Sequence, residues 1–178
     1  GKKEQKTGSK LKPVLQFNTG SVVLKLKQST AGLKVKMAKG DSVVSWKSGN
    51  TKIFKVKGKS NGTCKLTAQK KTGKATLTVR LKSGIQKKIT VKVQKTPVKT
   101  SRITGLNKSL TLKKGRQVTL KPSKLPFTSW QKITYTSSNS KIVSVTSKGR
   151  LKARKPGKAK ITVKSGSKKV TVTVIVKK

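Results

Sequence analysis

The stretch KITYTSSNSKIVSVTSKGRLKARKPGKAKITV, residues 132–163, decides the fold of this chain. Within it, short runs of alternating apolar and polar residues are separated by clusters of Ser, Asn, Gly and Pro. Alternation with a period of two is typical of a strand with one buried face, and these clusters are typical of tight turns. The stretch therefore predicts four short β-strands.

A near copy of this stretch lies upstream. The matching segments are SWKSGNTKIFKV (45–56) with TYTSSNSKIVSV (134–145), and KLTAQKKTGKATLTV (65–79) with RLKARKPGKAKITV (150–163), the former carrying one inserted residue. Trp46 then aligns with Tyr135, and Gly73 aligns with Gly157. We interpret the chain as a tandem repeat of one β unit.

The rest of the 178 residues continues the pattern of short strands and turns, without a helical period of 3.6 residues. Thr96-Pro97 marks a boundary, because proline ends strand pairing and holds the preceding residue extended. Each half is about the size at which a small sandwich buries its own core. We predict an all-β protein with two tandem immunoglobulin-like β-sandwiches, residues 13–97 and 98–178, preceded by a basic disordered arm, residues 1–12.

Several local expectations follow from the repeat. We expect residues 65–68 and 75–81 to pair as a hairpin around Gly73, and residues 150–164 to form the equivalent hairpin. Residues 122–127 are expected to be a loop. The expected core positions include Trp46, Phe54 and Tyr135, and the expected turn-stabilising residues are Asn50 and Asn139.

The second half resembles a known family. The segments SLTLKKGRQVTL, TYTSSNSKIVSV, SKGRL, RKPGKAKITV and VTVTVIV occur in the order typical of the bacterial Ig-like domain, group 2 family. The first half looks like a divergent copy, through SWKSGNTKIFKV and KKTGKATLTV. The resemblance implies immunoglobulin-like sandwiches in secreted or surface-attached bacterial proteins, often in tandem as adhesive or spacer modules, and it implies no catalytic residues.

The charge of the chain is strongly one-sided. Lys and Arg number 47 against two acidic residues, which gives a net charge of +45, and the basic residues are distributed over both halves. Ordinary protein surfaces mix both signs, so a surface of one sign indicates a polyanionic partner. In residues 150–164 the alternation of side chains gathers basic residues on outward faces, and we predict a polyanion-binding surface there, formed by Lys152, Arg154, Lys158, Lys160 and Lys164.

The composition excludes most kinds of catalysis by this chain. There is no His, and the two acids, Glu4 and Asp41, are far apart in the sequence, so no general acid–base pair or catalytic triad is expected. Zinc and calcium sites need clustered Cys, His or carboxylates, so we expect no metal and no cofactor. The single cysteine, Cys64, is expected to be a half-buried small residue, although nearby lysines offer a way to lower its pKa.

Three functions remain open at this point. The first is a non-catalytic secreted or cell-surface adhesion module that binds acidic glycans or wall polymers such as teichoic acids. The second is a non-specific nucleic-acid-binding protein, and the third is a passive stalk or spacer docked to the cell wall.

No apolar run is long enough to span a membrane. Gly1 looks like the remnant of a cleavage, so we expect a leader to have been removed; membership in a longer surface protein stays open.

The charge density predicts a salt-dependent stability. For 19.3 kDa, the scaling of surface with mass gives about 8,500 Å². The mean distance between net charges is then ~14 Å, above the Debye length of about 8 Å at physiological salt but below that of about 30 Å at 0.01 M. We expect the melting temperature to rise clearly between dilute buffer and physiological salt. A melting temperature that does not change with ionic strength would contradict this expectation.

Overall fold

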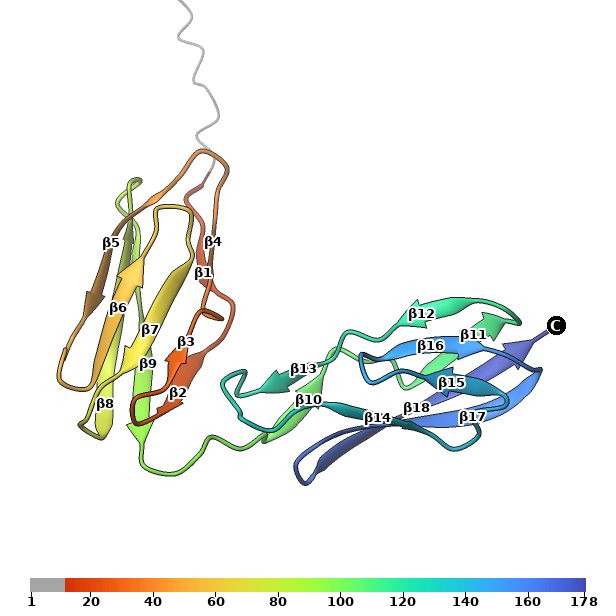
Figure 1. Ribbon diagram of the computed structural model, residues 1–178. Coiled ribbons are helices and arrows are strands. Elements are labelled where there is room, and N and C mark those ends of the chain that lie inside the picture. Colours follow the sequence, from red (N-terminus) through yellow and green to blue (C-terminus); the bar gives the residue numbers. More distant parts are fainter. Residues whose placement is uncertain (1–11) are drawn as a thin grey trace, which may run out of the picture. The chain divides into compact units, whose positions relative to one another are not determined.

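The computed structural model describes residues 12–178, and the regular structure in this range consists entirely of β-strands. The all-β prediction is therefore confirmed. The chain divides into two compact units, Gly1–Thr96 and Pro97–Lys178 (Figure 1). Of the predicted basic arm, residues 1–11 lie outside the described residues.

The first unit is a sandwich of a four-stranded sheet, ordered β2-β9-β8-β5, and a three-stranded sheet, ordered β3-β7-β6, with a short β1-β4 ladder beside them. β2 runs parallel to β9, and the other pairs are antiparallel. Its strands are β1 Leu15–Phe17, β2 Ser21–Lys25, β3 Ser29–Thr30, β4 Val35–Met37, β5 Val43–Ser48, β6 Phe54–Gly58, β7 Cys64–Ala68, β8 Gly73–Leu81 and β9 Gln86–Gln94.

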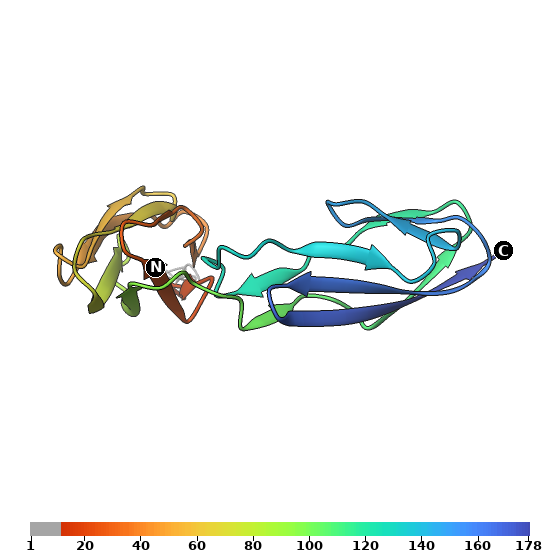
Figure 2. The same cartoon turned by 60° about the horizontal axis from the view of Figure 1, so that its bottom comes forward.

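The second unit repeats this topology. Its four-stranded sheet is ordered β11-β18-β17-β14, its three-stranded sheet β12-β16-β15, and β10-β13 forms the short ladder. Figure 2 shows the paired β17 and β18 in blue, ending at the C-terminus. β11 runs parallel to β18, as β2 does to β9. Its strands are β10 Arg102–Thr104, β11 Ser109–Lys113, β12 Gln117–Thr119, β13 Ser123–Leu125, β14 Thr134–Ser137, β15 Val143–Val145, β16 Arg150–Ala153, β17 Gly157–Ser165 and β18 Lys168–Lys177.

The core of each unit lies between its two larger sheets. Along β17 the buried Ala159, Ile161 and Val163 alternate with the exposed Lys158 and Lys160. The same alternation on the other strands leaves large apolar side chains fully buried; among these are Leu24, Phe54, Leu66, Leu77, Leu151 and Ile161. Burial of a side chain of this size stabilises the fold by roughly 1.5–3 kcal/mol. The inward residues of short alternating strands thus hold each unit together.

The predicted repeat is confirmed by matching hydrogen bonds in two turns. The Asn50 side-chain oxygen accepts a hydrogen bond from the Lys52 backbone N–H at 3.0 Å, and Asn139 does the same for Lys141 at 3.1 Å. Immediately before each turn, a serine hydroxyl donates to a backbone carbonyl, from Ser48 to Phe54 and from Ser137 to Val143. The two asparagines therefore stabilise equivalent turns, as the sequence predicts.

The two hairpins predicted from the sequence are wrong. β7 belongs to the three-stranded sheet and β8 to the four-stranded sheet, and the same holds for β16 and β17. The connections cross from one sheet to the other, and each ends at a glycine with positive φ, Gly73 at 139° and Gly157 at 146°. Such a φ suits glycine because it lacks Cβ. The predicted loop 122–127 also contains a short strand, β13.

The aligned Trp46 and Tyr135 occupy equivalent places and are half-buried. Trp46 pairs with Val79 across β5 and β8, and Tyr135 pairs with Val163 across β14 and β17. Each ring lies over a glycine. A Cβ added at Gly149 would lie 2.7 Å from Tyr135, and one added at Gly58 would overlap the Trp46 indole, whose Nε1 donates to the Lys59 carbonyl at 3.1 Å.

We expect Gly58→Ala to destabilise the protein by about 1–3 kcal/mol, because the added methyl displaces the indole from its place. The matched control is Gly20→Ala, where an added Cβ meets nothing within 4 Å. Denaturant unfolding followed by tryptophan fluorescence measures both variants. Equal stabilities of the two variants would show that Trp46 does not pack against Gly58.

Candidate functional site

The structure separates the five residues of the predicted polyanion-binding surface into two groups. Lys152 lies on β16 of the three-stranded sheet and Arg154 follows that strand, whereas Lys158, Lys160 and Lys164 lie on β17 of the four-stranded sheet. All five side chains are exposed.

These two groups face opposite ways. On each strand the exposed basic residues alternate with buried apolar residues, such as Leu151 on β16 and Ile161 on β17. These buried residues belong to one core between the two sheets. Exposed residues on the two strands therefore lie on the two opposite outer faces of the sandwich. The two groups therefore do not lie on adjacent faces of one hairpin, because β16 and β17 belong to different sheets, and polyanion binding by these residues stays a prediction.

Lysines stand directly opposite lysines on neighbouring strands. The antiparallel pairs of this kind are Lys57 with Lys65, Lys74 with Lys92, and Lys164 with Lys169. Side chains directly opposite each other in an antiparallel pair lie close together, and like charges there are destabilising. These pairs concentrate positive charge at fixed places on the sheets.

The acidic side chain within residues 12–178, Asp41, does not offset this charge. Its carboxylate accepts hydrogen bonds from the Ser83 hydroxyl at 2.6 Å and from the backbone N–H groups of Ser42 at 2.9 Å and Ser83 at 3.2 Å. These bonds, that from the Ser83 hydroxyl above all, lower the pKa of Asp41 below its usual value, although desolvation opposes them. Asp41 thus connects two turns, and within residues 12–178 no other acidic side chain is available to the opposed lysines.

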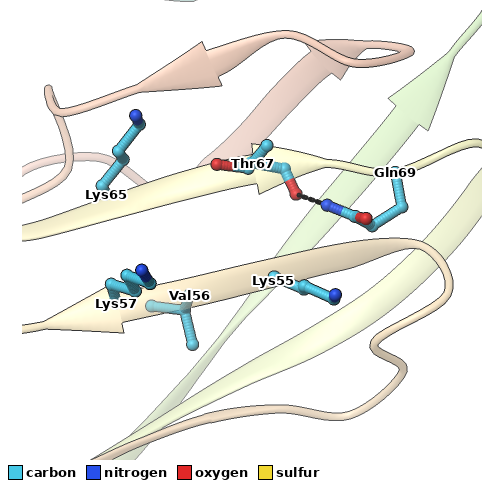
Figure 3. A pocket seen from close by; sticks show the side chains of 6 residues that line it. All are labelled: Lys55, Val56, Lys57, Lys65, Thr67 and Gln69. Carbon is cyan, nitrogen blue, oxygen red and sulfur yellow. Dashed lines mark hydrogen bonds between the residues drawn. The ribbon is translucent and has the colours of Figure 1, made fainter.

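One of the opposed pairs borders a depression on β6 and β7. Lys55 lies opposite Thr67, and Lys57 lies opposite Lys65. The depression has a volume of about 270 Å³, and its wall includes Gln69, whose side-chain amide donates to the Thr67 carbonyl at 3.0 Å (Figure 3). We call Lys55, Lys57, Lys65, Thr67 and Gln69 the β6–β7 lysine face.

The second unit carries different side chains at the same place. Val145 pairs with Leu151 as Val56 pairs with Leu66. In this register the second unit has Ser144 at the position of Lys55 and Lys152 at the position of Thr67. It has Arg154 at the position of Gln69. The Arg154 Nε donates to the Ser144 hydroxyl at 3.0 Å, so one basic group there is bonded within the sheet.

Sequence reasoning missed the β6–β7 lysine face, although a signal was present. Lys55 and Lys57 alternate with Phe54 and Val56, and a Gly- and Asn-containing turn at residues 58–63 returns the chain to Lys65. Alternation followed by such a turn predicts two adjacent strands with their lysines on one outer face.

Cys64 lies close to this face but is buried, with 6% of its surface exposed. Its Sγ donates a weak hydrogen bond to the Leu33 carbonyl at 3.5 Å. Burial raises the pKa of the thiol to about 11, so the idea that nearby lysines lower it is wrong. The thiol is protonated at neutral pH and is a poor nucleophile.

Within residues 12–178, no group of three or more His, Cys, Asp or Glu side chains comes together as a metal site. The same residues include no helix that is long and apolar enough to cross a membrane.

Comparisons with known proteins agree with this architecture. Residues 97–176 match the model of the bacterial Ig-like domain (group 2) family. None of the curated proteins matches the chain.

Solved structures of three kinds are similar to the chain. A GH10 xylanase from termite gut that contains a bacterial Ig-like domain is 29% identical over 38% of this chain and 18% of its own, with a TM-score of 0.33. Domains 4 and 5 of the S-layer protein SbsC are 20% identical over 93% of this chain and 98% of theirs, with a TM-score of 0.43. Drosophila N-cadherin EC1-3 is 10% identical over 90% of this chain and 66% of its own, with a TM-score of 0.45. The chain thus spans less than a fifth of the xylanase.

Lys57→Glu tests the repulsion within the β6–β7 lysine face. The change replaces a like-charge pair with Lys65 by an opposite-charge pair, and we expect it to stabilise the protein in dilute buffer by about 0.2–1 kcal/mol. Lys57→Gln is the control, because it removes the repulsion without adding an attraction. Unfolding by denaturant at low and high salt measures both variants. A Lys57→Glu protein no more stable than the parent in dilute buffer would argue against a destabilising pair.

Proposed function

We propose, from the premise that residues 97–176 belong to the bacterial Ig-like domain (group 2) family, that the protein is a non-catalytic, secreted or cell-surface module that binds polyanions. The ligands are acidic glycans or anionic wall polymers, held electrostatically by lysines on the outer faces of the sheets. The observation that carries the proposal is the set of lysine–lysine pairs on neighbouring strands, which have no carboxylate opposite them.

A bound polyanion relieves the repulsion within these pairs. Each anionic group placed between two opposed lysines replaces an unfavourable interaction by two favourable ones. The binding free energy then contains a large contribution from released counterions and falls steeply with added salt. Lysine suits this task, because its ammonium group is a mobile point charge that adapts to irregular polymers.

Nucleic acid is the alternative polyanion, and the composition of the basic surface favours it less. Proteins that recognise bases rely strongly on arginine, whose planar fork matches base edges and phosphates. Here the arginines are few: Arg80, Arg102, Arg116, Arg150 and Arg154. A passive stalk that is docked to an anionic wall uses the same charges without selecting a ligand.

Two triple variants with equal loss of charge test where binding occurs. The first replaces Lys55, Lys57 and Lys65 by Gln, and the second replaces Lys158, Lys160 and Lys164 by Gln. We expect the first triple to elute from immobilised heparin at a clearly lower salt concentration than the second, because its three lysines border one depression. Each triple disrupts one opposed pair, Lys57 with Lys65 or Lys164 with Lys169, so the loss of a pair does not distinguish them.

The parent protein and a double variant with Lys152 and Arg154 replaced by Gln complete the series. Equal losses in both triples would mean diffuse binding without a preferred face. Elution of the parent well below physiological salt would contradict polyanion binding as a function. Tighter binding of the parent to double-stranded DNA than to heparin at physiological salt would favour the nucleic-acid alternative.

A further inference from the structure

Trp130 is an exposed aromatic side chain on a protein with few aromatic residues. It lies in the loop between β13 and β14, and 63% of its surface is exposed. The remaining aromatic residues within residues 12–178 are buried or half-buried: Phe17, Trp46, Phe54, Phe127 and Tyr135. Single exposed apolar residues are common, so exposure by itself indicates no role. The way the loop is built gives a second observation.

The backbone on both sides of Trp130 is fixed by hydrogen bonds. The Trp130 N–H donates to the Val98 carbonyl at 2.9 Å. The partly buried ammonium of Lys124 donates to the Ser129 carbonyl at 2.6 Å and to the Gln131 carbonyl at 2.8 Å. The carbonyls immediately before and after the tryptophan residue are thus held by one cation.

A closed ring of buried polar groups lies beneath the loop. The Ser165 hydroxyl donates to the Gln131 carbonyl at 3.0 Å, and the Gln131 N–H donates to the Ser129 hydroxyl at 3.1 Å. The Thr100 hydroxyl lies between them, 2.8 Å from that of Ser129 and 2.7 Å from that of Ser165. Because the Ser165 proton is used by Gln131, Thr100 donates to Ser165 and Ser129 donates to Thr100.

This ring is buried, since Thr100, Ser129 and Ser165 are only 4%, 5% and 1% exposed. Buried hydroxyls stabilise a structure only when their hydrogen bonds are made, and here each hydroxyl donates once. A satisfied buried network of this kind rigidifies its surroundings. The loop is therefore a fixed support that presents the indole to solvent.

We propose that the exposed face of the Trp130 indole stacks against a sugar ring of the acidic glycan. The axial C–H groups of a pyranose carry partial positive charge and match the negative face of an aromatic ring. The exposed Lys132 lies two residues after Trp130, and the exposed Lys99 follows Val98, whose carbonyl accepts the hydrogen bond from the Trp130 N–H. Both lysines supply cations for the acidic groups of the glycan. This proposal rests on the proposed function and adds a contact that salt does not screen.

A single exposed aromatic ring favours a saccharide over a nucleic-acid strand as the ligand. Proteins that bind single strands stack successive bases on several aromatic side chains. Within residues 12–178, Trp130 is the one aromatic residue that is exposed. Because the backbone of the loop is already held by hydrogen bonds, it loses little conformational entropy on binding, which suits a contact with one ring.

The experiment compares two polyanions, one with rings and one without. Full-length parent and Trp130→Ala proteins are titrated with a heparin hexasaccharide and with inorganic polyphosphate of similar charge, at several salt concentrations. We expect Trp130→Ala to weaken saccharide binding about fivefold or more at every salt concentration, with the slope against log salt unchanged. Polyphosphate binding should be the same for both proteins.

The triple variant at Lys55, Lys57 and Lys65 separates this proposal from the proposed function. It should reduce the salt slope for both ligands, whereas Trp130→Ala should change only the affinity for the saccharide. Unchanged saccharide affinity, or equal losses for saccharide and polyphosphate, would overturn the stacking role while leaving electrostatic binding intact. A larger effect of Trp130→Ala on a single-stranded oligothymidylate than on the hexasaccharide would overturn the assignment to a glycan. Melting temperatures confirm that each variant is folded.

Discussion

Alternation of apolar and lysine side chains along short strands is the constraint on which the structure depends. The inward residues form two small cores, and the outward residues form a positively charged surface. The net charge of the chain is +45. This surface charge opposes folding, because like charges on directly opposite residues of neighbouring strands repel each other. Apolar burial in each core must exceed this repulsion, and screening by salt or by a bound polyanion reduces it. The salt dependence of stability and the polyanion binding that we propose therefore follow from one charge distribution.

The two units share their interior and differ at their surface. The turns around Asn50 and Asn139 are bonded alike, and Gly73 and Gly157 both admit a crossing between sheets. On the outer face of the three-stranded sheet, however, Lys55 stands where the second unit has Ser144. A repeated scaffold with varying faces is typical of folds whose function lies in grafted sites rather than in the core. Here we place the difference in the pattern of lysines and in the loop that carries Trp130.

The sequence predicts the interior better than the surface. Alternation and the internal repeat are signals within the sequence, and they identify the β class, the four strands of residues 132–163 and the equivalence of Trp46 and Tyr135. The sheet that a strand joins is determined by contacts with residues distant in the sequence, so no local pattern predicts it. A glycine turn at Gly157 looks the same whether the chain pairs back or crosses over. The sequence therefore predicts a hairpin with its basic residues on adjacent faces, whereas the two strands belong to different sheets. The presentation of Trp130 depends on Thr100 and Ser165, which are distant in sequence, and therefore no local pattern predicts it.

The central claim is that the positively charged surface of the protein binds acidic polymers at physiological salt. The most direct measurement is calorimetric titration of the parent protein with a sulfated oligosaccharide across a range of salt concentrations. The account predicts that the logarithm of the binding constant falls linearly with the logarithm of salt concentration, with a slope of several released ions, and that binding persists at physiological salt. A slope near zero, or no binding at physiological salt, would contradict it.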